Sequence, residues 1–235
     1  MDIHKPKPWH GVREFLKEYL IIVVGVLTPL AAEQGVEWGR HREIVGRGED
    51  ALGENFARFV EYTTSNADEL KCVSRRAAEL RAILDRAGTS RRLPRVGPIP
   101  QPYPLPWQID TWEAMVASGA APYLPQSRAV LYSRIAMSGV DLYNVATGEW
   151  ADWGALASLS GPPRAFSEAE EAKARDTLAR AVEQAGRVQF IAQHTVERIR
   201  MTGLLDRRAF DAAVARGRHP SHPPAMCDRI PVSDR

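Results

Sequence analysis

The sequence lacks the short motifs by which many enzyme classes are recognised. It contains no glycine-rich phosphate loop, no nucleophile elbow, no metalloprotease helix and no set of kinase motifs. It also lacks blocks of basic residues: acidic and basic residues alternate through the helical stretches, and the net charge is only +2. We therefore expect a protein that is not an enzyme, carries no cofactor and does not bind nucleic acid.

Cysteine is scarce, and the alternating pattern of β-strands is missing. The two cysteines, Cys72 and Cys227, fit no closely spaced metal motif, and their even number leaves one disulfide open in an oxidising compartment. Apolar residues recur every three or four positions, with no period of two. This pattern predicts an all-α protein, an antiparallel bundle of about four long helices.

Long hydrophobic runs are also rare, since only Tyr19 to Ala32 is uncharged and strongly apolar. As a helix this run covers about 21 Å, whereas a bilayer core is about 30 Å thick, so a span must extend over residues 15–38. We predict a transmembrane anchor there. A cleaved signal peptide, giving a secreted helical protein, and a buried helix of a soluble domain are the alternatives. Leu30 is large for a cleavage site and the run has no polar face, which favours the anchor.

The flanks of the run bear on its orientation. Basic residues lie on both sides: Lys5, Lys7, Arg13 and Lys17 precede it, and Arg40, Arg42 and Arg47 follow it. The small excess before the run favours a cytoplasmic segment 1–14 and an extracytoplasmic domain. At the membrane boundary, Glu33 and Gln34 either face a partner helix or a water pocket, or simply mark the end of the span.

The helical domain is expected over residues 39–216, with the anchor helix running on into it. Periodicity and capping residues predict five further helices: from Ser65 or Asn66 to Gly88, from Asp110 to Gly119, from Pro125 to Leu159, from Ser167 onward, and over Arg207 to Arg216. Gly139 and Gly148 could break the third of these. No strand is expected.

Two segments are too rich in proline for helices. Residues 89–109 hold six prolines, which favour an extended strap across the domain over a ligand for a proline-recognising module. Residues 217–235 form a tail rich in proline and histidine.

Two groups of side chains could carry chemistry. In the tail, His219, His222 and Cys227 could offer a metal two imidazoles and a thiolate, but proline-rich chain gives poor rigidity, so we expect no metal site. Aromatic residues gather in the central third and either line a ligand or partner surface or pack against the strap: Trp107, Trp112, Tyr123, Tyr132 and Tyr143.

The segments His10–Trp38 and Ile109–Asn144, together with Cys72 and Cys227, resemble a family of uncharacterised proteobacterial single-pass membrane proteins. The resemblance implies a retained anchor in a bacterial inner membrane with a periplasmic domain, and it implies no activity. Pro29 departs from the family's anchors and predicts a kink. The recurrence of both cysteines in that family, with an extracytoplasmic domain, implies a disulfide between them. Two separate thiols in a reducing compartment are the alternative.

These expectations converge on a membrane-anchored interaction protein, such as an accessory subunit of a membrane complex or a sensor-like module. Its partners would be the lipid bilayer, through residues 15–38, and a membrane protein or a second copy of the chain. A small-ligand receptor or an enzyme that uses the central aromatic group is the alternative.

Overall fold

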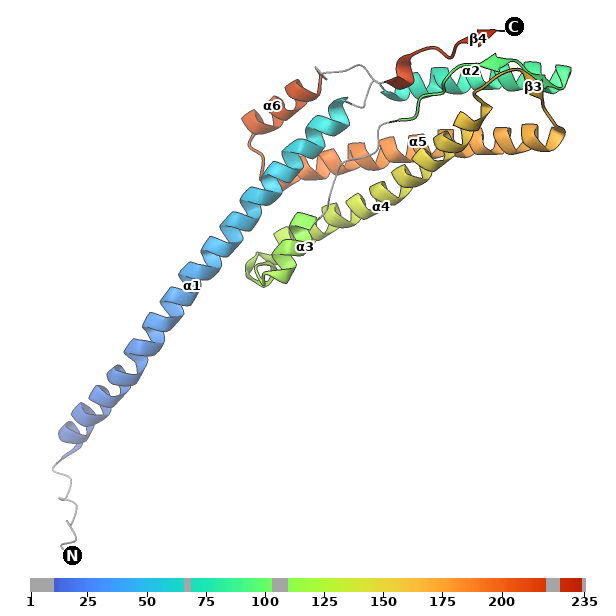
Figure 1. The fold of residues 1–235 in the computed structure, drawn as a ribbon. Coiled ribbons are helices and arrows are strands. Elements are labelled where there is room, and N and C mark those ends of the chain that lie inside the picture. Colours follow the sequence, from blue (N-terminus) through green and yellow to red (C-terminus); the bar gives the residue numbers. More distant parts are fainter. Residues whose placement is uncertain (1–10, 66–68, 103–109, 219–224, 234–235) are drawn as a thin grey trace, which may run out of the picture. The chain divides into compact units, whose positions relative to one another are not determined.

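The computed structural model describes residues 11–65, 69–102, 110–218 and 225–233 (Figure 1). The chain divides into two compact units, unit 1 (Met1–Arg47) and unit 2 (Gly48–Arg235). Residues 39–47, assigned to the helical domain on sequence grounds, belong to unit 1. The described part is all-α, as predicted. Its α-helices are α1 (Val12–Ser65), α2 (Glu69–Ser90), α3 (Asp110–Ala117), α4 (Gln126–Leu156), α5 (Glu168–Thr202) and α6 (Arg207–Gly217).

Helix α1 begins before the apolar run and continues into unit 2, which confirms that the helix containing the apolar run extends into the domain. It is 54 residues long, and Pro29 lies inside it. Short 3₁₀ helices follow elsewhere: η1 (Ala121–Tyr123), η2 (Ala157–Leu159) and η3 (Ala225–Cys227).

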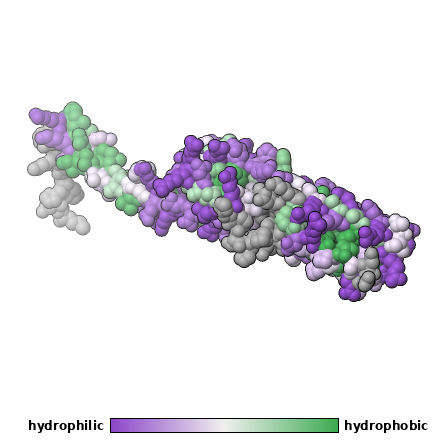
Figure 2. Space-filling model, turned by 90° about the horizontal axis from the view of Figure 1, so that it is seen from above, coloured by the Kyte–Doolittle hydropathy of each residue, from purple (hydrophilic) through white to green (hydrophobic). Residues whose placement is uncertain are grey.

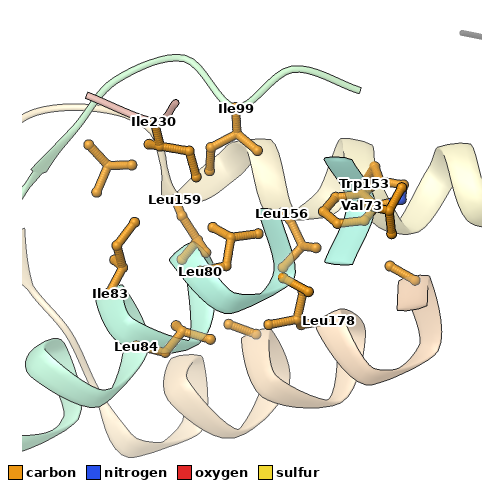
Figure 3. Close-up of a cluster of buried hydrophobic side chains, with 14 of the residues drawn as sticks. Val73, Leu80, Ile83, Leu84, Ile99, Trp153, Leu156, Leu159, Leu178 and Ile230 are labelled. Atoms are coloured by element: carbon orange, nitrogen blue, oxygen red, sulfur yellow. The ribbon is translucent and has the colours of Figure 1, made fainter. Parts of the chain in front are cut away.

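The main core of unit 2 lies between α2, α5 and the C-terminal end of α4 (Figure 3). From α2 come Leu80 and Leu84, both fully buried, and from α5 comes Leu178. Helices α4 and α5 are antiparallel neighbours, since Arg198 contacts Ser138 while Arg180 contacts Asp152. The α2 stripe and the first half of the α5 stripe thus share one core, as their helical spacing predicts.

The strap crosses this core, and its apolar residues Leu93, Val96 and Ile99 are buried in it. The structure adds four strands that sequence patterning did not predict: β1 (Arg92–Leu93), β2 (Arg95–Val96), β3 (Arg164–Ala165) and β4 (Val232–Ser233). Strand β1 pairs with β3 and β2 with β4, both antiparallel. Two-residue strands are too short to show a period of two, but they satisfy backbone groups that a buried strap cannot leave unpaired.

The helix ends show which local signals hold. The predicted capping box at α5 is present: Glu170 N donates to Ser167 Oγ (3.2 Å), and Ser167 N donates to Glu170 Oε2 (2.9 Å). The described part of helix α2 starts at Glu69, and the helix passes through Gly88, its predicted end, to Ser90. A Cβ at Gly88 would lie 2.5 Å from Glu171 Oε1, so this glycine permits close packing inside the helix and does not end it.

Candidate functional site

The apolar segment of α1, residues 15–38, is the strongest candidate for an interacting surface. In the described part of the chain it is the one helix long and apolar enough to cross a membrane, and none of its most apolar window is buried. Twelve large apolar side chains are exposed: Phe15, Leu16, Tyr19, Leu20, Ile21, Ile22, Val24, Val26, Leu27, Leu30, Val36 and Trp38. Figure 2 shows the apolar residues of this segment in green at its surface. A core helix of a soluble domain would bury this surface, so the geometry disfavours that alternative.

Polar groups at and near this segment are arranged compatibly with a bilayer. Thr28 Oγ1 donates to Val24 O at 2.7 Å, so its hydroxyl is satisfied within the helix. Arg42 lies over the Trp38 ring at 5.3 Å, a pairing suited to the interfacial zone. Glu33 and Gln34, the predicted boundary residues, are both exposed.

A second cluster surrounds Tyr132 and lies wholly in unit 2. The Tyr132 hydroxyl donates to Glu49 Oε1 at 2.7 Å, and Arg128 Nη1 donates to the same oxygen at 3.0 Å. The rings of Phe56 and Trp112 meet Tyr132 edge-on, at 6.4 and 6.1 Å. Burial, then the hydrogen bond and charge of Glu49, raise the pKa of the Tyr132 phenol, which therefore stays protonated and donating.

The cavity beside Tyr132 is small. Its volume is about 10 Å³, and Leu52, Phe56, Trp112 and Ile135 are among its lining residues. A cavity of this size holds one water molecule at most. The Tyr132 cluster therefore acts as a structural joint between α1, α3 and α4 and does not provide a pocket for a metabolite.

The structure brings together two of the five predicted aromatic residues, Trp112 and Tyr132. Tyr123 and Tyr143 are about half exposed, at 52% and 54%. Trp107 lies outside the described residues. The four described aromatic residues therefore form no single surface: Tyr132 is buried against the partly buried Trp112, and Tyr123 and Tyr143 are exposed on separate elements.

A third cluster holds the C-terminal segment against α2. Cys72 and Cys227 form a disulfide, as predicted. Arg76, with 1% of its surface exposed, donates through Nη2 to Met226 O at 3.2 Å and also to Asp228 O. Burial lowers the pKa of the Arg76 guanidinium, although Glu79 opposes this effect.

Further contacts in this third cluster hold the C-terminal segment against α2. Arg75 donates to the Cys227 carbonyl, and Ile230 N donates to Glu79 Oε2 at 3.4 Å. Met226 and Ile230 are buried in the main core. Part of the predicted Pro/His tail is thus an integral piece of unit 2.

The weak metal candidate is not assembled in the described residues. Cys227 is bonded to Cys72, so it offers no thiolate. His219 and His222 lie outside the described residues. Among the residues that are described, no group of three or more His, Cys, Asp or Glu side chains could hold a metal ion.

Sequence reasoning missed Arg76 and Glu49, which hold the two clusters of unit 2 together. Both pair with groups distant along the chain, Arg76 with Met226 and Glu49 with Tyr132. The available signal for Arg76 was its place, four residues after Cys72, in the otherwise apolar stripe of α2.

No family model matches this chain, and no curated protein and no solved structure matches it either. The family resemblance of the anchor and of Ile109–Asn144 therefore stays a prediction. Function has to be inferred from the geometry of the chain itself.

Proposed function

We propose that this chain is a membrane-anchored interaction protein that is not an enzyme. The apolar segment of α1 lies in the bilayer of a bacterial inner membrane, and unit 2 lies in the periplasm and binds a protein partner. The observation that carries this proposal is the exposure of twelve large apolar side chains on residues 15–38. The transfer of these side chains from water into lipid is favourable by on the order of 10 to 20 kcal/mol, so the helix is more stable in a bilayer than in water.

The disulfide supports the proposed compartment. Cys72 and Cys227 are bonded. Disulfides persist in oxidising compartments and are rare in the cytosol. Because both cysteines lie in unit 2, an extracytoplasmic unit 2 accounts for the bond. The N-terminus then lies in the cytoplasm, the orientation that the basic residues before the span favour.

The exposed flank of α4 supports a partner on unit 2. Tyr143 and Trp150 are seven residues apart, so they lie on nearly the same side of the helix. Their exposed fractions are 54% and 47%, and that of nearby Val140 is 44%. Large, half-exposed aromatic rings of this kind are enriched in protein interfaces. The one-water cavity at Tyr132 gives no comparable support to a ligand receptor or an enzyme.

Anchoring is tested by washing membranes from expressing cells with alkaline carbonate. We expect the full chain in the membrane pellet, with its N-terminal peptides detected by mass spectrometry. A Val26→Asp variant should lose much of this retention, because a carboxylate near the middle of a span costs about 2.5 to 3.5 kcal/mol. The matched Val36→Asp variant, at the end of the segment, should retain it. A soluble chain that begins near Glu33 would contradict the anchor.

Partner binding is tested by purification from native membranes in a mild detergent. Proteins retained by the wild-type chain should be lost with Tyr143→Ala/Trp150→Ala. Phe190→Ala is the matched control, since this ring is exposed on α5 and is not part of the α4 flank. Equal retention by all three chains would exclude the α4 flank as the contact.

A further inference from the structure

An uncharged loop joins α3 to α4. Residues 114–127, here called the tip loop, contain no charged side chain, although 26% of the whole chain is charged. The loop includes the end of α3, the 3₁₀ helix η1 and the first residues of α4. Its composition sets it apart from the charged surfaces of the neighbouring helices.

The tip loop presents apolar side chains to the outside. Val116 and Tyr123 are each 52% exposed, and Pro122 is exposed between them. Ala120 and Leu124 are buried and hold the loop against the bundle. The loop therefore combines a fixed base with an apolar outer surface.

The backbone of the tip loop satisfies many of its own hydrogen bonds. At the end of α3, Gly119 N donates to Val116 O at 3.1 Å and Ala120 N donates to Met115 O at 3.0 Å, with Gly119 at φ +73°. This is a Schellman motif, which closes the helix end. Tyr123 N and Leu124 N donate to carbonyls within the loop, at 3.1 and 3.2 Å. Backbone groups that are hydrogen-bonded in this way cost little free energy to remove from water.

The tip loop lies at the end of unit 2 where the chain enters it. Gly48 is the first residue of unit 2, and a Cβ there would lie 2.7 Å from Met115 Cε. Glu49 accepts a hydrogen bond from Arg128, just past the loop, at 3.0 Å. Figure 1 shows α3 beside the N-terminal end of α4. Helix α4 has 31 residues and spans about 46 Å, so its other end is far from the loop.

The length of chain between the proposed span and unit 2 limits how far the loop can be from lipid. Trp38 and Gly48 are ten positions apart, which is about 15 Å of helix and at most about 36 Å of extended chain. If the apolar segment spans the bilayer, the entry end of unit 2 stays near its surface. We propose that the tip loop rests on the bilayer, with Val116, Pro122 and Tyr123 in the interfacial zone. This inference rests on the proposed function.

Bilayer is the occupant that best fits the chemistry. Tyrosine is favoured at the level of the lipid headgroups, where its amphipathic ring is stable. The absence of charge removes the main cost of entering that zone. Lipid contact at two places, the span and the loop, would hold unit 2 in one orientation on the membrane.

The test uses the full chain in lipid nanodiscs. An environment-sensitive nitrobenzoxadiazole probe is attached to Val116→Cys, or to Ala172→Cys, an exposed site near the start of α5 at the opposite end of the bundle. The native cysteines are bonded to each other, so labelling without reductant is selective. We expect lipids that carry a spin label high on the acyl chain to quench the probe at 116 at least twofold more than the probe at 172.

Several outcomes would overturn the proposal. Equal or absent quenching at the two sites places the loop away from lipid. A blue-shifted but unquenched probe at 116 means that a second copy of the chain covers the loop. A chain that does not co-purify with nanodiscs at all contradicts the anchor itself, and with it the inference. With the probe moved to Ala117, Tyr123→Asp should at least halve the quenching, and unchanged quenching would exclude Tyr123 from the contact.

Discussion

The hydroxyl of Tyr132 donates a 2.7 Å hydrogen bond to Glu49, a residue 83 positions earlier in the chain. This bond joins the part of α1 in unit 2 to α4, beside the residues that lead to the proposed span. The joint is buried, because Tyr132 is only 1% exposed. Loss of this hydrogen bond should therefore lower the free energy of unfolding and leave partner binding unchanged.

Replacing Tyr132 by Phe should lower the free energy of unfolding by about 1 to 2 kcal/mol. The ring contacts with Phe56 and Trp112 remain, but Glu49 loses one of its donors. Urea unfolding followed by circular dichroism measures the change. Tyr143→Phe, which alters an exposed hydroxyl, should stay within about 0.5 kcal/mol of the wild type. Similar effects of the two changes would contradict the joint.

Replacing Arg76 by Ala should release the C-terminal segment. The change leaves the carbonyls of Met226 and Asp228 without their donor and opens a cavity under them, so we expect a loss of about 3 kcal/mol or more. Limited proteolysis should then cleave the chain after Cys227 faster than in the wild type. Arg81→Ala, an exposed arginine of the same helix, is the control and should be cleaved at the wild-type rate.

Removing the disulfide with Cys72→Ser/Cys227→Ser should lower stability by up to about 5 kcal/mol. The bond closes a long loop, with a sequence separation of 155, and the entropy that it removes from the unfolded chain grows with the logarithm of that length. Non-reducing peptide mapping of native protein should recover the two cysteines in one linked fragment. Two free, alkylatable thiols would contradict the bond and weaken the assignment of unit 2 to the periplasm.

The capping box of α5 should make part of the stability depend on acid pH. The backbone hydrogen bond from Ser167, followed by the bond from Arg164, lowers the pKa of Glu170 from 4.5 to about 2. A depressed pKa stabilises the fold above pH 4.5, and this contribution disappears as the pH falls towards 2. Glu170→Gln should therefore be less stable than the wild type at pH 6, and the gap should close by pH 2. Urea unfolding of both proteins at pH 6 and at pH 2 measures the gap.

A phosphatase that is active only in the periplasm, fused after Arg235, should be active if unit 2 lies outside the cytoplasm. A matched reporter that is active only in the cytoplasm, fused at the same position, should be inactive. An inactive phosphatase together with an active cytoplasmic reporter after Arg235 would reverse the orientation.

Local signals predicted the helices well because they act over a few residues. The apolar run predicted α1, and Ser167 with Glu170 predicted the start of α5. Gly88 misled the prediction of where α2 ends, because its small size serves packing against Glu171 and not a turn. Glycine at a helix end and glycine at a close contact look alike in a sequence.

Non-local pairs were beyond the reach of these signals. The pairing of β2 with β4 joins residues more than a hundred positions apart, and Arg76 finds its acceptors at a similar distance. No periodic pattern encodes which distant carbonyl a buried guanidinium will meet. The disulfide is the exception, because a chain with two cysteines has one intramolecular pairing to offer.

The bond between Cys72 and Cys227 also governs how unit 2 would carry mechanical load. If lipid holds α1 and a force acts on the C-terminal end of the chain, the tension passes along α1 and the start of α2 and then crosses directly to Cys227. The residues between the two cysteines, which include α3, α4, α5 and α6, are bypassed. The flank of α4 would therefore stay folded under a force that would unfold the same domain without the disulfide.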